Sequence, residues 1–479
     1  MIAIARRQAR ALRGVLRRST LGIAHRGPLP PLILLADGEM VRVRYVAADL
    51  AVELVVPAAG PSSGSVALPL DALADLEGRD DAPLALDPVA PDRTVARWAD
   101  RGIPQAREYA VPARPQPGAF PALPVEWREA SPALLDALAE AAATTTAGST
   151  RYALDCPLLR SGPAGGEVVA TDGRQALIRR GLDFPWDGDV LVPGSPAFAC
   201  RDLPRDRPWQ VGRTGAHVVL RCDSTTIALA IRTEARFPRV DEVFGDPAGA
   251  TARLRLDPAD AAFLAASLGR LPGAADPLAP VTVDLNGHVA VRARGGADAA
   301  ATELVLARSG YTGTPTRFSS PRGPLGRALR LGFAEVEVGE PDGPLVCRSG
   351  SLAYAWQPLH ADSIVPADAV AARVESRASG SPVPVIGPTD AAVSAPTPVG
   401  HAAAAATAPA SPPAGDADRE PADLAALVRE AEALRDELGA ARARYQRLVV
   451  ALRRHRKQAR ATAATLRALR QLQLQDVAG

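Results

Sequence analysis

The stretch Glu167-Val-Val-Ala-Thr-Asp-Gly-Arg-Gln-Ala-Leu-Ile-Arg-Arg180 decides the fold class of this 479-residue chain. An apolar run leads into Asp172-Gly173, a pair suited to the positive φ angle of a tight turn, and a second apolar run leaves it. The stretch therefore predicts a β-hairpin. This pattern alone is common to many proteins that contain β-sheets, so the neighbouring sequence has to specify the rest.

The hairpin lies in the middle of a pattern that occurs three times. Each pass reads as a helix, a hairpin, a short helix and a second hairpin, and spans roughly 110–120 residues, a size that can hold its own core. Long helices are predicted over residues 5–18, 131–143 and 257–268, the second with Ser131 as its N-cap. The sequence thus predicts an α+β chain of three similar domains at residues 1–125, 126–248 and 249–362.

Two further motifs flank the hairpin. Arg151-Tyr-Ala-Leu154 precedes it, and Arg236-Phe-Pro-Arg-Val-Asp-Glu-Val-Phe244 follows it. Together the three motifs resemble the middle domain of the bacterial DNA polymerase III β sliding clamp, which carries R-Y-x-L, V-A-T-D-G-H-R-L-A and R-F-P-D-Y-x-x-V-L-P. Residues 32–57 resemble the opening hairpin of that family, and residues 349–359 resemble its C-terminal strand. The resemblance covers roughly three quarters of the chain.

The resemblance implies a DNA scaffold and not an enzyme. In that family two subunits meet head to tail in a six-domain ring that encircles duplex DNA. The ring contacts the DNA phosphates without reading the base sequence. The ring tethers DNA polymerase and clamp-loader-type proteins through short peptide motifs. The implied function is that of a processivity factor in replication or repair, located in the cytoplasm at the nucleoid. The alternative is a clamp-fold paralogue that acts as a coiled-coil interaction scaffold without topological DNA binding.

The resemblance also implies three sets of site residues. DNA contact is expected at Arg6, Arg7, Arg10, Arg13, Arg26, Arg151 and Tyr152. A partner-peptide pocket between the second and third domains is expected to be lined by Leu154, Thr171, Gly173, Arg174, Phe244, Trp356, Pro358 and Leu359. The dimer interface is expected to bring Tyr109 and Val111 against Leu264 and Leu268. The alternatives are a solvated arginine face on the first helix and ordinary core positions for Leu154, Phe244 and Leu359.

Departures from the family motifs occur in the pocket. Arg174 stands where the family has histidine, Ala176 where it has leucine, Gly245 where it has proline and Gln357 where it has methionine. The pocket is therefore expected to bind different peptides, or none. The predicted helices at residues 131–143 and 257–268 carry acidic residues and no basic ones, which weakens the expected hold on DNA.

Composition excludes several other classes. The 55 Lys and Arg nearly balance the 53 Asp and Glu, so any basic surface has to be local. The four cysteines have no C-x-x-C spacing, and the six histidines show no close metal-ligand spacing, so no metal or cofactor is expected. No stretch approaches the ~18 apolar residues of a membrane span, so no membrane association is expected. No set of residues matches a catalytic constellation.

The C-terminal quarter lies beyond the resemblance. Residues 363–418 are rich in Ala, Pro, Ser and Gly and are predicted to be a disordered linker. From Leu424 to Leu469 apolar residues recur at 3,4 spacing over about seven heptads, which predicts a coiled coil at residues 419–475. Its partner is a second copy or another coiled-coil protein. The second half is rich in arginine, so phosphate contact is an alternative to a solvated face.

The isolated tail, residues 421–475, is expected to be a self-associating helix, because a lone helix would leave its apolar stripe in water. Circular dichroism should show helicity that rises with peptide concentration, and Leu434→Pro and Leu438→Asp should each abolish it. Helicity independent of concentration, or a random-coil spectrum at tens of micromolar, would contradict a coiled coil.

Overall fold

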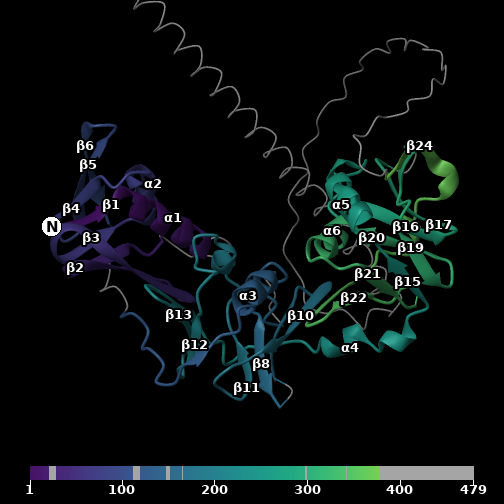
Figure 1. Ribbon diagram of the computed structural model, residues 1–479, viewed down its shortest axis with the longest axis horizontal. Coiled ribbons are helices and arrows are strands. Elements are labelled where there is room, and N and C mark those ends of the chain that lie inside the picture. Colours follow the sequence, from purple (N-terminus) through teal and green to yellow (C-terminus); the bar gives the residue numbers. More distant parts are fainter. Residues whose placement is uncertain are drawn as a thin grey trace, which may run out of the picture. The chain divides into compact units, whose positions relative to one another are not determined.

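The computed structural model describes residues 1–20, 29–111, 119–146, 152–163, 165–296, 299–340 and 342–376 (Figure 1). These residues belong to one compact unit, Met1–Gly387. The expected DNA contacts Arg26 and Arg151, the predicted coiled coil at 419–475 and most of the predicted linker lie outside the described residues.

Helices and strands recur in three repeats along the chain (Figure 1). The first repeat contains β1 (Ile2–Ala5), α1 (Arg6–Thr20), β2 (Leu32–Val46), β3 (Leu50–Leu68), η1 (Leu70–Ala72), α2 (Leu73–Leu76), β4 (Pro83–Ala90), β5 (Arg93–Asp100) and β6 (Ile103–Ala110). The second contains β7 (Arg128–Glu129), α3 (Leu134–Ala142), β8 (Leu158–Gly162), β9 (Gly165–Thr171), β10 (Gln175–Leu182), β11 (Gly188–Leu191), η2 (Pro196–Ala199), β12 (Gln210–Arg213), β13 (His217–Cys222) and β14 (Thr225–Ala230), and is followed by α4 (Asp241–Phe244) and η3 (Pro247–Gly249).

The third repeat has the plan of the second, with one additional strand, β19. It contains β15 (Ala252–Arg255), α5 (Pro258–Ser267), η4 (Leu268–Arg270), β16 (Pro280–Asn286), β17 (His288–Arg294), β18 (Ala301–Val305), β19 (Gly310–Gly313), β20 (Thr316–Pro321), α6 (Arg322–Arg330), β21 (Glu335–Val338), β22 (Leu345–Ser349) and β23 (Leu352–Trp356). A C-terminal arm follows, with η5 (Ala361–Ser363), η6 (Ala367–Ala369) and β24 (Val370–Glu375).

The C-terminal arm corrects one expectation from the sequence. Residues 363–376 were predicted to belong to a disordered linker, yet they include η6 and β24. Val365 is buried and donates its backbone N–H to Thr282 Oγ1 at 2.7 Å. The short apolar side chains of this stretch resemble linker composition, but the third repeat supplies the hydrogen-bonding partners that fix it.

Local sequence signals explain the helices. In α1, the buried residues Ala9, Leu12, Val15 and Leu16 recur at the spacing of one helix face. In α5, Asp257 is the N-cap and accepts a hydrogen bond from the backbone N–H of Ala259 at 2.9 Å. The predicted N-cap of α3, Ser131, is wrong by two residues, because Ala133 is the N-cap.

The start of α3 has a local cause. The backbone N–H of Leu134 donates to the carbonyl of Ser131 at 2.9 Å, so a tight turn precedes the helix.

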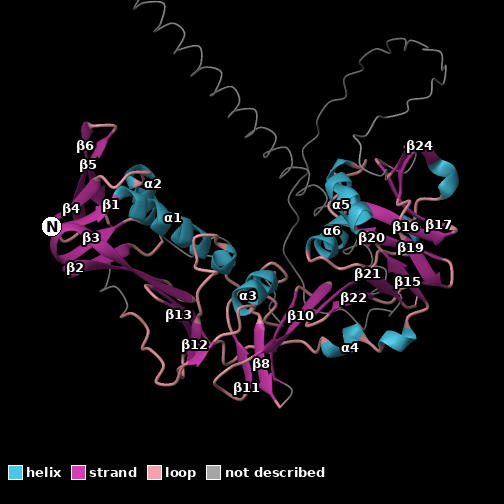
Figure 2. Cartoon of the chain, viewed as in Figure 1, coloured by secondary structure: helices cyan, strands magenta, loops and turns pink. Residues whose placement is uncertain are grey.

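In the described part of the chain the helices lie against strands: α1 contacts β1 and β3, α3 contacts β9 and β10, and α6 contacts β20 (Figure 2).

The strands form four sheets. A four-stranded sheet has the order β1-β4-β5-β6, and a six-stranded sheet the order β2-β3-β14-β13-β12-β7. A nine-stranded sheet has the order β11-β8-β9-β10-β23-β22-β21-β15-β19, and a five-stranded sheet the order β20-β16-β17-β18-β24. Two of these sheets cross from one repeat to the next, because β14 pairs with β3 and β23 pairs with β10, both antiparallel.

A buried arginine reinforces the junction between the second and third repeats. Arg327 of α6 donates to the carbonyl of Ala143 at 2.7 Å and to Thr144 Oγ1 at 2.7 Å, and it also donates to the carbonyl of Glu140. These acceptors lie at and just beyond the C-terminal end of α3, where helix carbonyls lack intrahelical partners. Burial lowers the pKa of the Arg327 guanidinium, and the ring of Tyr354 lies 5.5 Å away.

Replacing Arg327 with alanine is expected to destabilise the protein by about 2–5 kcal/mol, because buried acceptors at the end of α3 lose a charged donor. Arg330 on the same helix is exposed, so Arg330→Ala is the matched control and should change stability by less than ~0.5 kcal/mol. Urea unfolding followed by circular dichroism measures both. Equal midpoints for the two variants would contradict the assigned role of Arg327.

Candidate functional site

The Thr-Asp-Gly turn is held by hydrogen bonds within itself. Asp172 accepts bonds from the backbone N–H groups of Arg174 at 2.8 Å and Gln175 at 2.9 Å. Thr171 donates its hydroxyl to the carbonyl of Gln175 at 2.7 Å and accepts from the N–H of Gly173 at 3.0 Å. Gly173 has φ of 87°, which favours glycine. The turn therefore holds Arg174 at the surface in a fixed place.

A cavity of about 520 Å³ lies beside this turn. Its walls come from the second and third repeats and are mostly apolar, with charged or polar groups from both repeats. The lining residues are Asp172, Arg174, Gln175, Pro277, Leu278, Pro321, Gly323, Pro324, Gln357, Pro358, Leu359 and His360. A second cavity of about 480 Å³ shares Gln175, Gly323 and Pro324 with the first, so the two adjoin. We call this pair of cavities the inter-repeat cleft.

Three of the eight residues expected in the peptide pocket line the inter-repeat cleft: Arg174, Pro358 and Leu359. The structure does not bring the others together as a binding surface. Phe244 is buried in a cluster with Val240 and Ala176, and Trp356 is buried in the core of the third repeat. Trp356 also donates its indole N–H to Ser320 Oγ at 3.0 Å.

The remaining three lie near the turn. Thr171 is buried, Leu154 is half-buried and Gly173 is exposed. A Cβ placed on Gly173 would lie 3.7 Å from Leu154 Cδ1, so these two residues are neighbours. For Phe244 the alternative interpretation as a core residue fits its burial, and Trp356, for which no such alternative was given, is a core residue as well. A substitution at either position would change packing before it changed a partner contact.

Several cleft residues were not expected from the sequence. Leu278 is 43% exposed, and Pro277 and Leu278 lie in the chain that leads into β16. Pro324 lies in the first turn of α6. No motif marks these positions. A signal for Leu278 was its place in a proline-rich connector, where an apolar side chain has no periodic core to join.

The structure corrects the expectation that Arg6 contacts DNA. Its side chain is 7% exposed, and it donates to the carbonyls of Leu76, Ala99 and Glu77 and to Asp100 Oδ1 at 3.4, 3.1, 2.8 and 3.2 Å. A guanidinium enclosed in this way cannot approach a phosphate. Arg6 instead ties the start of α1 to α2 and β5.

The other arginines of α1 lie at the surface or near it. Arg7 is exposed and forms an ion pair with Asp81 at 2.6 Å, and Arg10 is exposed. Arg13 is half-buried and pairs with Glu77 at 2.6 Å. Tyr152 is half-buried. The positive charge that α1 exposes is therefore smaller than the number of arginines in its sequence suggests.

Helix α3 has a different electrostatic character. Glu140 pairs with Arg179 at 3.0 Å, and burial raises the pKa of the Glu140 carboxyl while Arg179 opposes that shift. Asp136 pairs with Arg205. Both carboxylates are thus partly neutralised by arginines from outside the helix. α3 contributes no basic residue of its own.

The residues expected at a dimer interface are buried within the single chain. Tyr109 and Val111 are 7% and 6% exposed, and Leu264 and Leu268 are 1% and 4% exposed. Tyr109 donates its hydroxyl to Asp75 Oδ2 at 3.1 Å, and burial, with Asp75 nearby, raises the pKa of Tyr109 to about 12. These four side chains are already buried in the single chain, so little of their surface is left for contact with a second copy.

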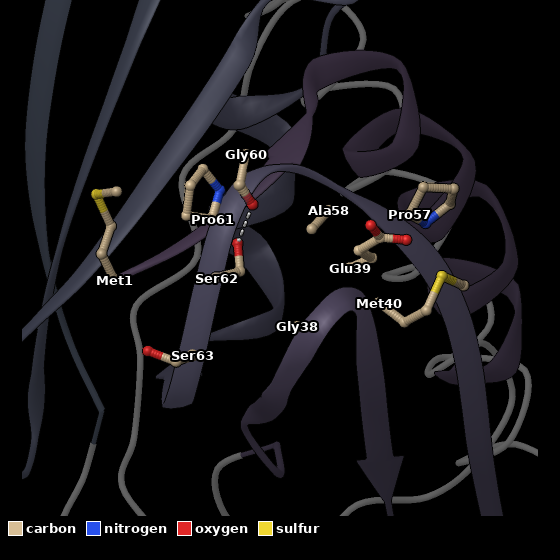
Figure 3. Close-up of a pocket in the computed structure, with 10 residues that line it drawn as sticks. All are labelled: Met1, Gly38, Glu39, Met40, Pro57, Ala58, Gly60, Pro61, Ser62 and Ser63. Atoms are coloured by element: carbon tan, nitrogen blue, oxygen red, sulfur yellow. Dashed lines mark hydrogen bonds between the residues drawn. The ribbon is translucent and has the colours of Figure 1, made fainter.

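Another cavity, of about 790 Å³, lies at the β2–β3 hairpin (Figure 3). Met1, Met40 and the chain around Gly60 line it, and Glu39 is its one charged lining residue. Ser62 donates to the carbonyl of Gly60 at 3.0 Å and accepts from the N–H of Ala3 at 2.9 Å. These contacts join β1 to the hairpin and place no reactive group in the cavity.

The described residues offer no site for a metal ion and no helix that could span a membrane. Within them, no group of three or more His, Cys, Asp or Glu is placed to hold a metal ion. In the same residues no helix combines the length and the apolar character needed to cross a membrane. All four cysteines are buried, and burial raises the pKa of the Cys156 and Cys347 thiols.

Comparison with known proteins identifies the fold. No protein-family model and no curated protein sequence matches the chain. Among solved structures, the DNA polymerase III beta subunit of Pseudomonas aeruginosa superimposes with a TM-score of 0.61 at 15% sequence identity, over 75% of this chain and 99% of that one.

Clamps from distant organisms give the same result. The Thermotoga maritima beta subunit has a TM-score of 0.60 at 12% identity, and the Borrelia burgdorferi beta subunit has 0.63 at 9%. Both cover 75% of this chain and 99% of their own. The chain therefore has the fold of the DNA polymerase III beta subunit, the bacterial sliding clamp, with a sequence that has diverged far from those of the solved examples.

Proposed function

We propose that the chain is a sliding-clamp-like DNA tether, in which two copies close head to tail into a ring. The pairing rule at the two internal junctions supports this proposal. In each repeat, one row of strands ends in the last strand of the repeat: β1-β4-β5-β6, β7-β12-β13-β14 and β15-β21-β22-β23. β14 joins β3 of the preceding repeat, and β23 joins β10.

β6 is the last strand of the first repeat, and no preceding repeat exists within the chain to pair with it. It forms an edge of the described sheet. By position, β18 of the third repeat corresponds to β10, because both close a three-stranded meander after the first helix. The same rule applied once more pairs β6 of one copy with β18 of a second. Two such junctions would close a ring.

The hydrogen-bonding groups of β6 are oriented for that pairing. Val111 donates its N–H to the carbonyl of Asp92 at 2.7 Å, toward β5. Alternate residues of an antiparallel strand point to opposite neighbours, so the N–H groups of Ala106, Glu108 and Ala110 point away from β5. Pro104, which has no N–H, lies in the same outward register.

Ala106→Pro is expected to weaken dimerisation by at least about tenfold, because it removes an outward donor and leaves a ladder carbonyl unpaired, at a cost of about 1–3 kcal/mol. Ala106→Val keeps the donor and is the matched control. Sedimentation of the full chain up to tens of micromolar measures the dissociation constant. Retention on circular duplex DNA that is lost on linearisation measures ring closure.

Two outcomes would count against the ring. Equal dimerisation of the Ala106→Pro and Ala106→Val chains would remove β6 from the interface. DNA binding that is the same on circular and linear duplexes would remove topological closure. Tyr109→Asp is not a suitable probe, because Tyr109 is part of the core of the first repeat.

DNA contact is proposed for two of the exposed arginines of α1, Arg7 and Arg10. Phosphate contacts of this kind carry no sequence information and are compatible with sliding. Arg330 of α6 is the exposed basic residue of the third-repeat helix. Since α3 and α5 supply no basic side chain, the proposed hold on DNA is weak, and its salt dependence is shallow because few phosphates are contacted.

Arg7→Gln with Arg10→Gln is expected to flatten the dependence of log binding constant on log salt concentration by about 1.8 per copy, since each lost phosphate contact removes ~0.9. The effect should be the same for unrelated duplex sequences. Arg255→Gln, which changes an exposed arginine on β15, is the control. An unchanged slope in the double variant would place the phosphate contacts elsewhere in the chain.

The inter-repeat cleft is the proposed site for a short peptide of a polymerase or clamp-loader-type protein. Its apolar wall would receive apolar side chains, and Arg174 on its rim would favour an acidic group in the partner. One solved clamp with this fold, from Pseudomonas aeruginosa, is bound to griselimycin and has a TM-score of 0.60 and 16% identity to this chain.

A second function is an interaction scaffold that does not encircle DNA. One observation favours it: Arg327, one of few basic residues on the helices of the third repeat, is buried and bonded to α3. In that case the predicted coiled coil would carry the main interaction, by itself or with another coiled-coil protein. The circular and linear duplex comparison separates the two functions.

A further inference from the structure

The edge of β18 that head-to-tail closure would use is already occupied. β24 of the C-terminal arm pairs with β18, from Ala301 opposite Val370 to Val305 opposite Glu375. β24 is thus the last strand in the order β20-β16-β17-β18-β24. The corresponding order in the second repeat is β11-β8-β9-β10-β23. β24 therefore stands in the place that a following repeat takes at the other junction.

The pairing of β24 differs from the internal junctions in direction. β14 with β3 and β23 with β10 are antiparallel, whereas β24 with β18 is parallel. Its register also shifts between Ala301 and Thr302. Parallel pairing is slightly less stable per residue than antiparallel pairing. An antiparallel strand offered by another copy would therefore be a competitive replacement.

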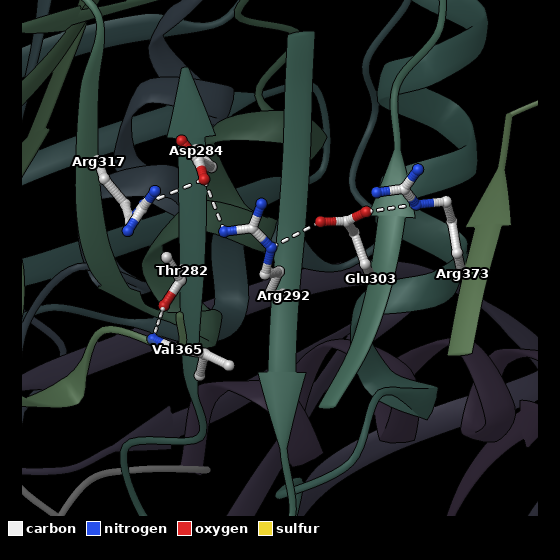
Figure 4. A network of polar contacts seen from close by, with 7 residues as sticks. All are labelled: Thr282, Asp284, Arg292, Glu303, Arg317, Val365 and Arg373. Carbon is white, nitrogen blue, oxygen red and sulfur yellow. Dashed lines mark hydrogen bonds and ion pairs between the residues drawn. The ribbon is translucent and has the colours of Figure 1, made fainter. Parts of the chain in front are cut away.

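A row of ion pairs across five strands anchors β24 (Figure 4). Arg292 pairs with Asp284 at 2.6 Å and with Glu303 at 2.6 Å, and all three side chains are buried. Arg317 of β20 pairs with Asp284 at 3.0 Å, and Arg373 of β24 pairs with Glu303 at 2.6 Å. Glu303 therefore has two arginine partners, one of which belongs to β24.

The other contacts of β24 are few. Val374 packs against the core of the third repeat. Ser376 donates its N–H to the carbonyl of Val305 at 2.9 Å and accepts from the N–H of Ala307 at 3.0 Å. The side chain of Arg373 is 63% exposed, and four of the six residues of β24 are exposed. A strand held by a short ladder, one packed side chain and one ion pair whose arginine is exposed can be displaced without unfolding the repeat.

We propose that β24 is a displaceable strand that competes with β6 of a second copy for the edge of β18. This inference rests on the proposed head-to-tail function and adds a gate to it. With β24 in place, the third repeat has no free edge at β18 and the chain stays monomeric. Ring closure requires β24 to leave the edge of β18. Only chains with β24 released can dimerise, so the apparent affinity of dimerisation is proportional to the fraction of released chains.

A reversible lock tests the gate in the full chain. Thr302 and Ala372 are register partners, so Thr302→Cys with Ala372→Cys places two thiols across the β18–β24 pair. The four native cysteines are buried and should not compete. Oxidation should abolish dimerisation and retention on circular DNA, and a reductant should restore both. The single variant Ala372→Cys under the same oxidant is the control.

A releasing variant gives the opposite readout. Arg373→Glu places like charges at Glu303 and should weaken β24, lowering the apparent dissociation constant of the dimer by at least about tenfold. Arg255→Glu is the matched control, because it reverses an exposed arginine that pairs with Glu335 in the same repeat. Circular dichroism confirms that each variant is folded.

The outcomes separate the gate from the ring. Dimerisation that is unchanged by the oxidised lock and by Arg373→Glu would overturn the gate and leave the ring standing. If neither the reduced chain nor the Arg373→Glu chain dimerises at any concentration or is retained on circular DNA, the proposed ring itself is wrong, and the gate with it. Loss on locking together with gain on release supports both.

Discussion

The backbone hydrogen bonds at the ends of sheets are the constraint on which the rest of this structure depends. An edge strand presents unpaired N–H and C=O groups, and proteins cover or disrupt such edges. Here two of the edges are satisfied inside the chain, by β14 on β3 and by β23 on β10. These ladders connect successive repeats, so the same contacts that complete each sheet also fix the order of the repeats.

Side chains reinforce those ladders. Arg327 closes the end of α3 from the third repeat, and Tyr354 of β23 donates its hydroxyl to the side chain of Gln175 at 2.6 Å. Gln175 is the first residue of β10 and also donates to Asp172 at 2.8 Å. Hydrogen bonds therefore join the Thr-Asp-Gly turn to the inter-repeat ladder, and Asp172 and Gln175 of this network also line the cleft. This explains why the cleft lies at a junction and not within a repeat.

The sequence predicted the repeats and their hairpins because these depend on local signals. Asp172-Gly173 has the turn geometry that its residues favour, and α5 begins at the Asp257 cap. It did not predict which arginines are buried. Arg6 precedes the buried Ala9 by three residues and so lies on the apolar face of α1, a signal that was available but unused. The acceptors of Arg6 come from distant segments, and no local pattern reveals them.

β24 shows the limit of composition more sharply. Residues 363–376 read as linker because alanine and valine make up half of them, and their strand exists only through the edge of β18. A strand whose stability comes from its partner, and not from its own sequence, can be exchanged for another strand that offers the same ladder. The buried row of ion pairs makes that exchange selective, because the strand that replaces β24 has to leave Glu303 satisfied by Arg292 and solvent, or supply a cation of its own. Edge pairing and charge at one strand thus couple the C-terminal arm to the interface.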